Sequence, residues 1–414
     1  MKKFINEKNY YRVGIILYIL FSISIFLGLL INEDASGKGT SNDFKNTWEY
    51  VLLLEENYFI DSSKWTRLLP FHYIFLSILY GLLGSEFLVR MLFCILSLSI
   101  PLIFYKNLRL KFKDTIKGKL LILASIILIL PYFRSSAIWP NPHISALFFL
   151  LFSIYFFQKW YQSKIKKINL NFILHLIFLA LTVYTRRYYV FFFLYYFLYY
   201  FKYLNIKDFL ITSFFVLLLS IPGFILIINF PFYLSSIGYN FKFYNSFLII
   251  TSIFFFYIIS FIDLETLKVS NLRSKLLLCS SIILIIILSF FFDYNPKLGG
   301  GFIMKFSNIF LGGNLLFYLS SIIGTYLLSK IFLNNKEDFF LIILIFFIFS
   351  NNYMFQKYFE PLWLIIFFLI LNLNFVKKFL RSNFQIFIVL FFFSIYSISA
   401  LINSFYSISI NHFW

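Results

Sequence analysis

Residues 13–31 read VGIILYILFSISIFLGLLI, and residues 32–68 read NEDASGKGTSNDFKNTWEYVLLLEENYFIDSSKWTRL. The first stretch has no charged side chain and matches the roughly 20 apolar residues that a helix needs to cross a bilayer. The second stretch holds seven of the 17 Asp and Glu residues in the chain, namely Glu33, Asp34, Asp43, Glu49, Glu55, Glu56 and Asp61. Together the two stretches predict a membrane-spanning helix followed by an acidic loop. This arrangement indicates chemistry at the membrane surface.

The composition of the chain excludes a soluble protein. Of its 414 residues 61% are hydrophobic and only 13% are charged, against about 25% charged in soluble domains. The net charge of +19 does not indicate nucleic-acid binding, because the basic residues lie in short loops between apolar segments, where they determine topology. We expect an all-α fold, a polytopic membrane helical bundle that forms a single integral membrane domain over residues 1–414.

Apolar segments of about the length of a tilted membrane helix recur along the chain, and we expect 13 of them to span the membrane. The expected spans are 13–31, 87–105, 120–138, 143–160, 170–184, 188–203, 209–229, 246–262, 276–292, 308–330, 339–353, 361–376 and 384–405.

The segment 69–84 (LPFHYIFLSILYGLLG) decides the topology. It is apolar, but it has only 16 residues and begins with Leu-Pro. If it spanned the membrane, the basic loop 106–119 would lie outside, so the positive-inside rule favours an in-plane or re-entrant helix. Residues 32–86 are then the first extracytoplasmic loop. With this choice the cytoplasmic side carries 24 Lys and Arg with 7 Asp and Glu, and the outside carries 12 with 10.

Charged groups at or near membrane depth are functional candidates by default. Asp43, in the acidic loop, is a candidate general base, or else a solvated loop carboxylate. Arg67 and His72 flank the start of the in-plane helix, where Arg67 would bind substrate or only reach lipid phosphates. Asn141 and His143 lie in Trp139-Pro140-Asn141-Pro142-His143, where two prolines make either a rigid platform for binding or a plain turn.

Two further candidate places on the outside each contain cationic side chains. Arg186 and Arg187 oppose the charge bias of the other loops, and guanidinium groups suit a phosphate or diphosphate. Because only three residues separate spans 170–184 and 188–203, we expect both arginines in a turn. Lys357 and Glu360 lie near an outside helix start, where they either pair with each other or contact substrate. His175, inside an apolar span, indicates a buried histidine with satisfied hydrogen bonds.

This layout resembles the membrane glycosyltransferases of the GT-C type, which use sugars linked to polyprenyl phosphate. The resemblance rests on residues 13–200: a first span, an acidic outside loop with Asp43, a Pro-containing helix at 69–84, and Gly84-Ser85-Glu86-Phe87-Leu88-Val89-Arg90 at the head of the second span. The chain departs from the family pattern with Asn141-Pro142 in the second outside loop, where many relatives carry an acidic residue. It also has Asn42-Asp43 where relatives commonly have Asp-Glu.

The resemblance implies an inverting, hexosyltransferase-like enzyme in the bacterial inner membrane, with its active site on the extracytoplasmic side. Its donor would be a polyprenyl-phosphate sugar and its acceptor a lipid-linked or surface glycan. Asp43 would be the base, and Arg186, Arg187 and Lys357 would stabilise the leaving phosphate. No metal site is evident from spacing, although the acidic loop could gather a divalent cation through Asp43. The alternatives are a transporter or flippase of lipid-linked sugars, a polysaccharide polymerase or ligase, and a purely structural membrane protein.

The topology is testable by labelling an engineered cysteine at position 113. We expect Lys113→Cys to react with a membrane-permeant thiol reagent and to be protected from an impermeant one in intact cells, because loop 106–119 faces the cytoplasm. Strong labelling from outside would overturn the topology.

Overall fold

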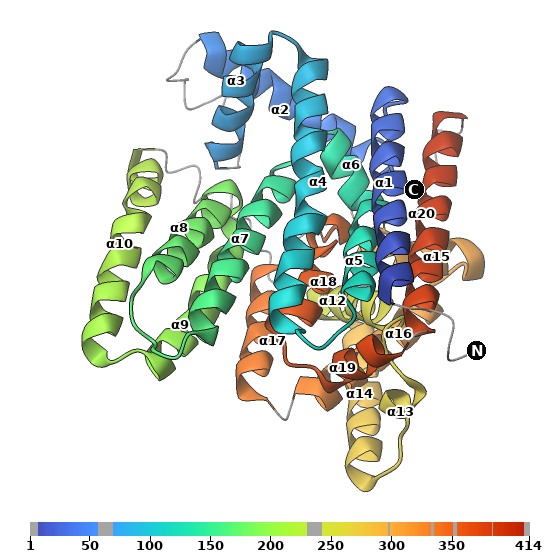
Figure 1. Ribbon diagram of the computed structural model, residues 1–414. Coiled ribbons are helices and arrows are strands. Elements are labelled where there is room, and N and C mark those ends of the chain that lie inside the picture. Colours follow the sequence, from blue (N-terminus) through green and yellow to red (C-terminus); the bar gives the residue numbers. More distant parts are fainter. Residues whose placement is uncertain are drawn as a thin grey trace. The chain divides into compact units, whose positions relative to one another are not determined.

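The computed structural model describes residues 7–56, 69–229, 242–296, 299–332, 335–350, 354–382 and 384–409. All regular elements within these ranges are helices, in agreement with the expected fold class (Figure 1). Contacts group the chain into two units, described separately below. Unit 1 comprises Met1–Ile237 and Phe393–Phe413, and unit 2 comprises Gly238–Phe392 with Trp414.

The described residues form an integral membrane protein with six to eight candidate spanning helices. Six helices are long and apolar enough: α1 (Glu7–Leu30), α4 (Glu86–Lys111), α7 (Pro142–Gln162), α10 (Ile206–Asn229), α14 (Leu272–Phe290) and α20 (Gln385–Ser409). Two bent helix pairs raise the number to eight if each pair is one span. The number 13 remains a prediction, since the other expected segments form shorter apolar helices.

The remaining helices are shorter than a span. Those of unit 1 are α2 (Gly39–Glu56), α3 (Phe71–Leu83), α5 (Lys117–Ser125), η2 (Ile126–Ile129), α6 (Pro131–Ile138), α8 (Leu170–Thr185), η3 (Arg187–Tyr189) and α9 (Val190–Tyr203). Those of unit 2 are α12 (Phe243–Ile258), α13 (Leu264–Leu267), α15 (Gly301–Leu311), α16 (Leu315–Phe332), α17 (Lys336–Ile348), η5 (Gln356–Tyr358), α18 (Leu362–Ile365), η6 (Ile366–Ile370) and α19 (Asn374–Arg381).

The core of unit 1 is the bent pair formed by α5–η2 and α6. Nearly every side chain from Gly118 to Ile138 is buried, and α1, α4 and α7 pack around this segment (Figure 1). The 65° bend falls at Pro131, which lacks a backbone N–H and therefore starts a new helix instead of continuing the old one. At the other end Gly118 lets α5 approach α1, because a Cβ there would meet the Tyr10 backbone.

The acidic loop contains a helix that the sequence pattern did not lead us to expect. Within α2 the buried residues Phe44, Thr47, Val51 and Leu54 recur three or four positions apart, which is one face of a helix. Helix α3 covers most of segment 69–84, and α2 and α3 pack on each other. At 13 residues, α3 is shorter than a span, so its in-plane orientation stays a prediction.

One expected span is interrupted. The segment 308–330 is not a single helix, because α15 ends at Leu311 and α16 begins at Leu315. Gly312 adopts a left-handed conformation (φ 61°), which ends α15 in the usual manner of a C-terminal glycine. The expected span 361–376 is broken as well: η6 ends in a turn, and α19 leaves it at 93°.

A tyrosine hydroxyl is inserted into the backbone hydrogen bonds of α10. Tyr184 of α8 donates to the carbonyl of Leu219 (2.6 Å) and accepts from the N–H of Gly223 (3.1 Å). In an unbroken helix these two backbone groups bond to each other. The insertion lies beside Pro222, the proline inside α10, and it attaches α10 to the end of α8.

Loops of unit 2 contact one another in two sets, and each set joins segments that are expected on the same side of the membrane. In unit 2, Lys378 pairs with Asp263 and Glu265, which join expected cytoplasmic loops. Expected outside segments also meet, since Asn245 donates to the Asp293 carbonyl. Which set faces the cytoplasm remains a prediction from charge.

Candidate functional site

Polar side chains of unit 1 gather at the N-terminus of α7, where α3 and the α8–α9 turn approach it. Four residues that the sequence singled out come together here, although they are far apart in the chain: His72, Asn141, His143 and Arg186. All four are buried. The Trp139–His143 turn, the start of α3 and the Arg186 turn therefore lie close together in unit 1.

Asn141 organises the turn. It is the N-cap of α7, with Pro142 at the first helical position, and its side-chain oxygen accepts from the N–H of His143 (3.0 Å). The same oxygen lies 3.5 Å from Nη1 of Arg186. The positive end of the α7 dipole and a guanidinium group therefore lie side by side, which favours an anion.

The Arg186–Arg187 segment is a turn, as expected. Helix α8 ends at Thr185, Arg186 is extended (φ −150°, ψ 106°), and Arg187 opens the short helix η3. Both guanidinium groups lie beside the Tyr188 ring, at 5.8 and 5.7 Å from its centroid. Arg186 is buried in the cluster, whereas Arg187 is only half-buried.

The two histidines connect the turn to neighbouring helices. His72 Nε2 lies 3.4 Å from the Pro140 carbonyl, which can only accept, so this nitrogen carries the proton and Ser145 donates to Nδ1 (3.1 Å). Burial, opposed by the hydrogen bond to Pro140 and reinforced by the charge of Arg186, lowers the pKa of His72 to about 3, so the ring is neutral. His143 Nδ1 lies 3.1 Å from the hydroxyl of Tyr189.

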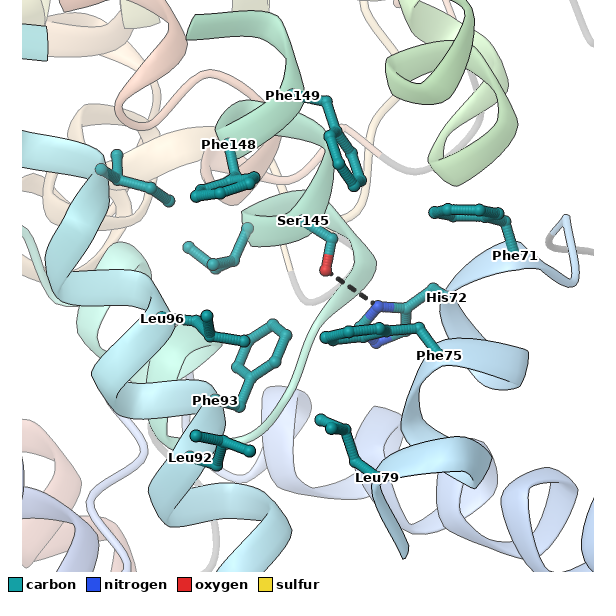
Figure 2. A pocket seen from close by; sticks show the side chains of 12 residues that line it. Phe71, His72, Phe75, Leu79, Leu92, Phe93, Leu96, Ser145, Phe148 and Phe149 are labelled. Carbon is teal, nitrogen blue, oxygen red and sulfur yellow. Dashed lines mark hydrogen bonds between the residues drawn. The ribbon is translucent and has the colours of Figure 1, made fainter. Parts of the chain in front are cut away.

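An apolar cavity of about 410 Å³ adjoins this cluster. It lies between α3, α4 and α7, and His72 and Ser145 form part of its wall (Figure 2). Its other lining side chains are all apolar: Phe71, Phe75, Leu79, Leu92, Phe93, Leu96, Ile100, Ile144, Phe148 and Phe149. A hydrogen-bonding edge and an apolar interior suit an amphiphilic ligand.

A buried ion pair fixes the start of the acidic loop. Arg134 of α6 binds Glu33 with two bonds, Nε to Oε1 at 2.8 Å and Nη2 to Oε2 at 2.6 Å, and both side chains are almost fully buried. The Glu33 carbonyl also accepts from the indole of Trp139, which precedes the Pro140–Pro142 turn. Arg90 lies over the same indole, 3.7 Å from the ring centroid, and donates to Asn32.

Two acids of the loop lie in different environments. Asp34 is buried, and its carboxylate accepts from Ser36 and from the N–H of Ser41, which secures the start of α2. Asp43 is exposed on α2, next to Phe44, whose ring packs on Trp139 (5.7 Å). The expected base is thus accessible near the turn, and its role stays a prediction.

Lys357 and Glu360 belong to unit 2, where both are buried. Glu360 accepts a 2.5 Å hydrogen bond from the hydroxyl of Tyr257, which in turn accepts from Gln356. The ammonium group of Lys357 lies 5.2 Å from the centre of the Phe355 ring. These residues form a second polar cluster, at the start of the bent pair of that unit. Arg67, the remaining candidate, lies outside the described residues.

Sequence reasoning missed the structural role of Arg134 and Arg90. A signal was present for Arg134, because an arginine inside an expected apolar span demands a partner. Ser145 and Tyr189 carried no such signal. The interpretation of His175 is confirmed: its ring nitrogens bond Ser153 (2.7 Å) and Tyr200 (2.5 Å) in the core of unit 1.

Comparisons with protein-family models, with curated proteins and with solved structures find no match to this chain. In the described part of the chain no group of three or more His, Cys, Asp or Glu side chains is placed to hold a metal ion. Function must therefore be inferred from the geometry of the site.

The Glu33–Arg134 pair gives a stability prediction. Glu33→Gln should destabilise the protein by about 3–5 kcal/mol, because it leaves a buried guanidinium without its counter-charge. Thermal unfolding in detergent measures the effect, with Glu49→Gln as a matched control on exposed α2. Adding Arg134→Met to Glu33→Gln should recover part of the loss. Equal melting temperatures for Glu33→Gln and Glu49→Gln would contradict the prediction.

Proposed function

We propose that the chain is a GT-C-type glycosyltransferase. It moves a sugar from a polyprenyl-phosphate donor to a lipid-linked or surface glycan acceptor on the extracytoplasmic face of the membrane. The proposal joins the resemblance seen in residues 13–200 to the geometry of unit 1.

One observation carries the proposal: a buried polar cluster that contains the Arg186 cation meets an apolar cavity at His72 and Ser145. A lipid phosphate has the matching shape, with an anionic head and an apolar tail. Its phosphate would lie at the α7 N-terminus beside Arg186 and Asn141. Its tail would enter the cavity between α3, α4 and α7. Neither a soluble sugar nor a free phosphate would use both parts.

The reaction that fits these groups is an inverting displacement. A carboxylate takes the proton of the acceptor hydroxyl, whose oxygen then bonds to the anomeric carbon of the donor sugar. The bond from that carbon to the phosphate oxygen breaks, and its electron pair stays on the lipid phosphate. Arg186, with Arg187 in the adjoining turn, would stabilise the charge that develops there.

Asp43 is the better candidate for the base within the described loop. Asp34 already accepts three hydrogen bonds that secure the start of α2, so protonating it would oppose those bonds. Asp43 is exposed and close in sequence to Phe44, which packs at the turn. We therefore assign proton transfer to Asp43 and a structural role to Asp34.

A transporter or flippase of lipid-linked sugars is the second candidate. The two bent helix pairs favour it, because transporters bind substrates at discontinuous helices. It would bind the donor phosphate at the same residues, Arg186 and Asn141, but would move the donor without breaking a bond. A polysaccharide polymerase or ligase is a neighbouring enzyme class, which differs in its acceptor.

The phosphate contact is tested with purified protein in lipid nanodiscs and a polyprenyl-phosphate sugar. Arg186→Lys should weaken donor binding by roughly tenfold or more, because a charge-assisted hydrogen bond is worth about 1.5–3 kcal/mol and lysine lacks the planar fork. Arg187→Lys changes the half-buried neighbour in the same turn and should have a smaller effect. Unchanged affinity in both variants would rule out a phosphate site at this turn.

The base is tested by transfer assays on loop variants. Asp43→Asn should bind donor normally and lose transfer by ~100-fold or more, the low end of general-base contributions. Glu49→Gln, another acid of α2, should retain activity, and Asp34→Asn should mainly lower the melting temperature. If Asp34→Asn loses transfer while folding normally and Asp43→Asn does not, Asp34 takes over the role. Donor movement across the bilayer without transfer would favour the flippase.

A further inference from the structure

We infer that the cavity between α3, α4 and α7 binds only about the first three isoprene units of the donor tail, so that donors are selected by this short segment and not by total chain length. This inference rests on the proposed function. It specifies the lipid tail of the donor, about which the proposed phosphate contacts of Arg186 and Asn141 say nothing.

The volume of the cavity sets the length. A dry protein cavity of about 150 Å³ accommodates one benzene ring, which has six carbon atoms. At the same ratio the 410 Å³ of this cavity has room for about 16 carbons. Three isoprene units contain 15 carbons, so a farnesyl segment fills the space. A geranyl segment leaves about a third of it empty, and an undecaprenyl tail must continue into the bilayer.

The wall of the cavity directs the prenyl chain. Figure 2 shows His72 and Ser145 facing the cavity, and His72 also contacts the Pro140 carbonyl at the start of the Asn141 turn. Along α4, Leu96 and Ile100 line it progressively farther from Arg90, which lies at the loop end of that helix. A tail whose phosphate is held at the α7 N-terminus would therefore pass His72 and run along α4. Charge complementarity at one end favours a prenyl phosphate as the occupant over an uncharged lipid.

The first experiment compares donors that carry the same sugar phosphate on geranyl, farnesyl and undecaprenyl tails. The value of kcat/KM should be similar for farnesyl and undecaprenyl donors, within about threefold. It should fall by roughly 30-fold or more for the geranyl donor, because each buried methylene contributes to binding. Farnesyl phosphate without sugar should compete with the undecaprenyl donor, whereas a phosphatidic acid of equal charge should not.

The second experiment narrows the cavity. Leu96→Trp places an indole on a lining position that is itself 36% exposed, so the helix can accept the larger side chain. It should raise KM for the farnesyl donor by tenfold or more and change kcat little. Leu102→Trp is the matched control, since Leu102 lies on the same helix, is 40% exposed and is not part of the cavity wall. Melting temperatures of both variants show whether folding is affected.

The outcomes distinguish a failure of the tail inference from a failure of the glycosyltransferase proposal. If kcat/KM rises steadily from farnesyl to undecaprenyl, or if Leu96→Trp behaves like Leu102→Trp, the tail inference is wrong and the glycosyltransferase proposal stands. The tail inference is also wrong if phosphatidic acid competes as well as farnesyl phosphate. If no lipid donor supports transfer by the unaltered protein, the proposed function itself fails.

Discussion

Because it is buried, the Glu33–Arg134 pair is the interaction on which the arrangement of unit 1 depends. Either group alone would carry a large desolvation penalty there, so the two must meet. Their meeting joins the end of α1 to the centre of α6. The contact of Glu33 with Trp139 then places the loop beside the turn that carries Asn141. A single electrostatic requirement thereby determines where the start of the acidic loop lies on α6.

The site combines two kinds of recognition that seldom share one surface. Asn141 and the start of α7 supply oriented donors, and Arg186 supplies a full positive charge close to them. The neighbouring cavity is almost entirely hydrocarbon. His72 belongs to both, because its ring is neutral and hydrogen-bonded yet faces apolar side chains. The chain has few charged residues, and it places one of them, Arg186, buried beside the N-terminus of α7.

Local features of the sequence predicted local features of the structure. The three-residue gap around Arg186 predicted its turn, and the two prolines predicted the tight turn that ends at the N-cap Asn141. Contacts across the chain were beyond such reasoning. The pairing of Arg134 with a residue 101 positions earlier depends on how helices pack, which periodicity does not encode. Helix α2 was missed because its amphipathic face lies in a segment that its acids mark as a loop.

One oxygen atom, that of the Tyr184 hydroxyl of α8, connects the Leu219 carbonyl and the Gly223 N–H of α10. Without that oxygen the Leu219 carbonyl and the Gly223 N–H would have to bond directly to each other or lose a partner. Tyr184 is the penultimate residue of α8 and lies two positions before Arg186. The hydroxyl therefore couples the middle of α10 to the turn that carries Arg186, and a displacement of α10 would be transmitted to this turn.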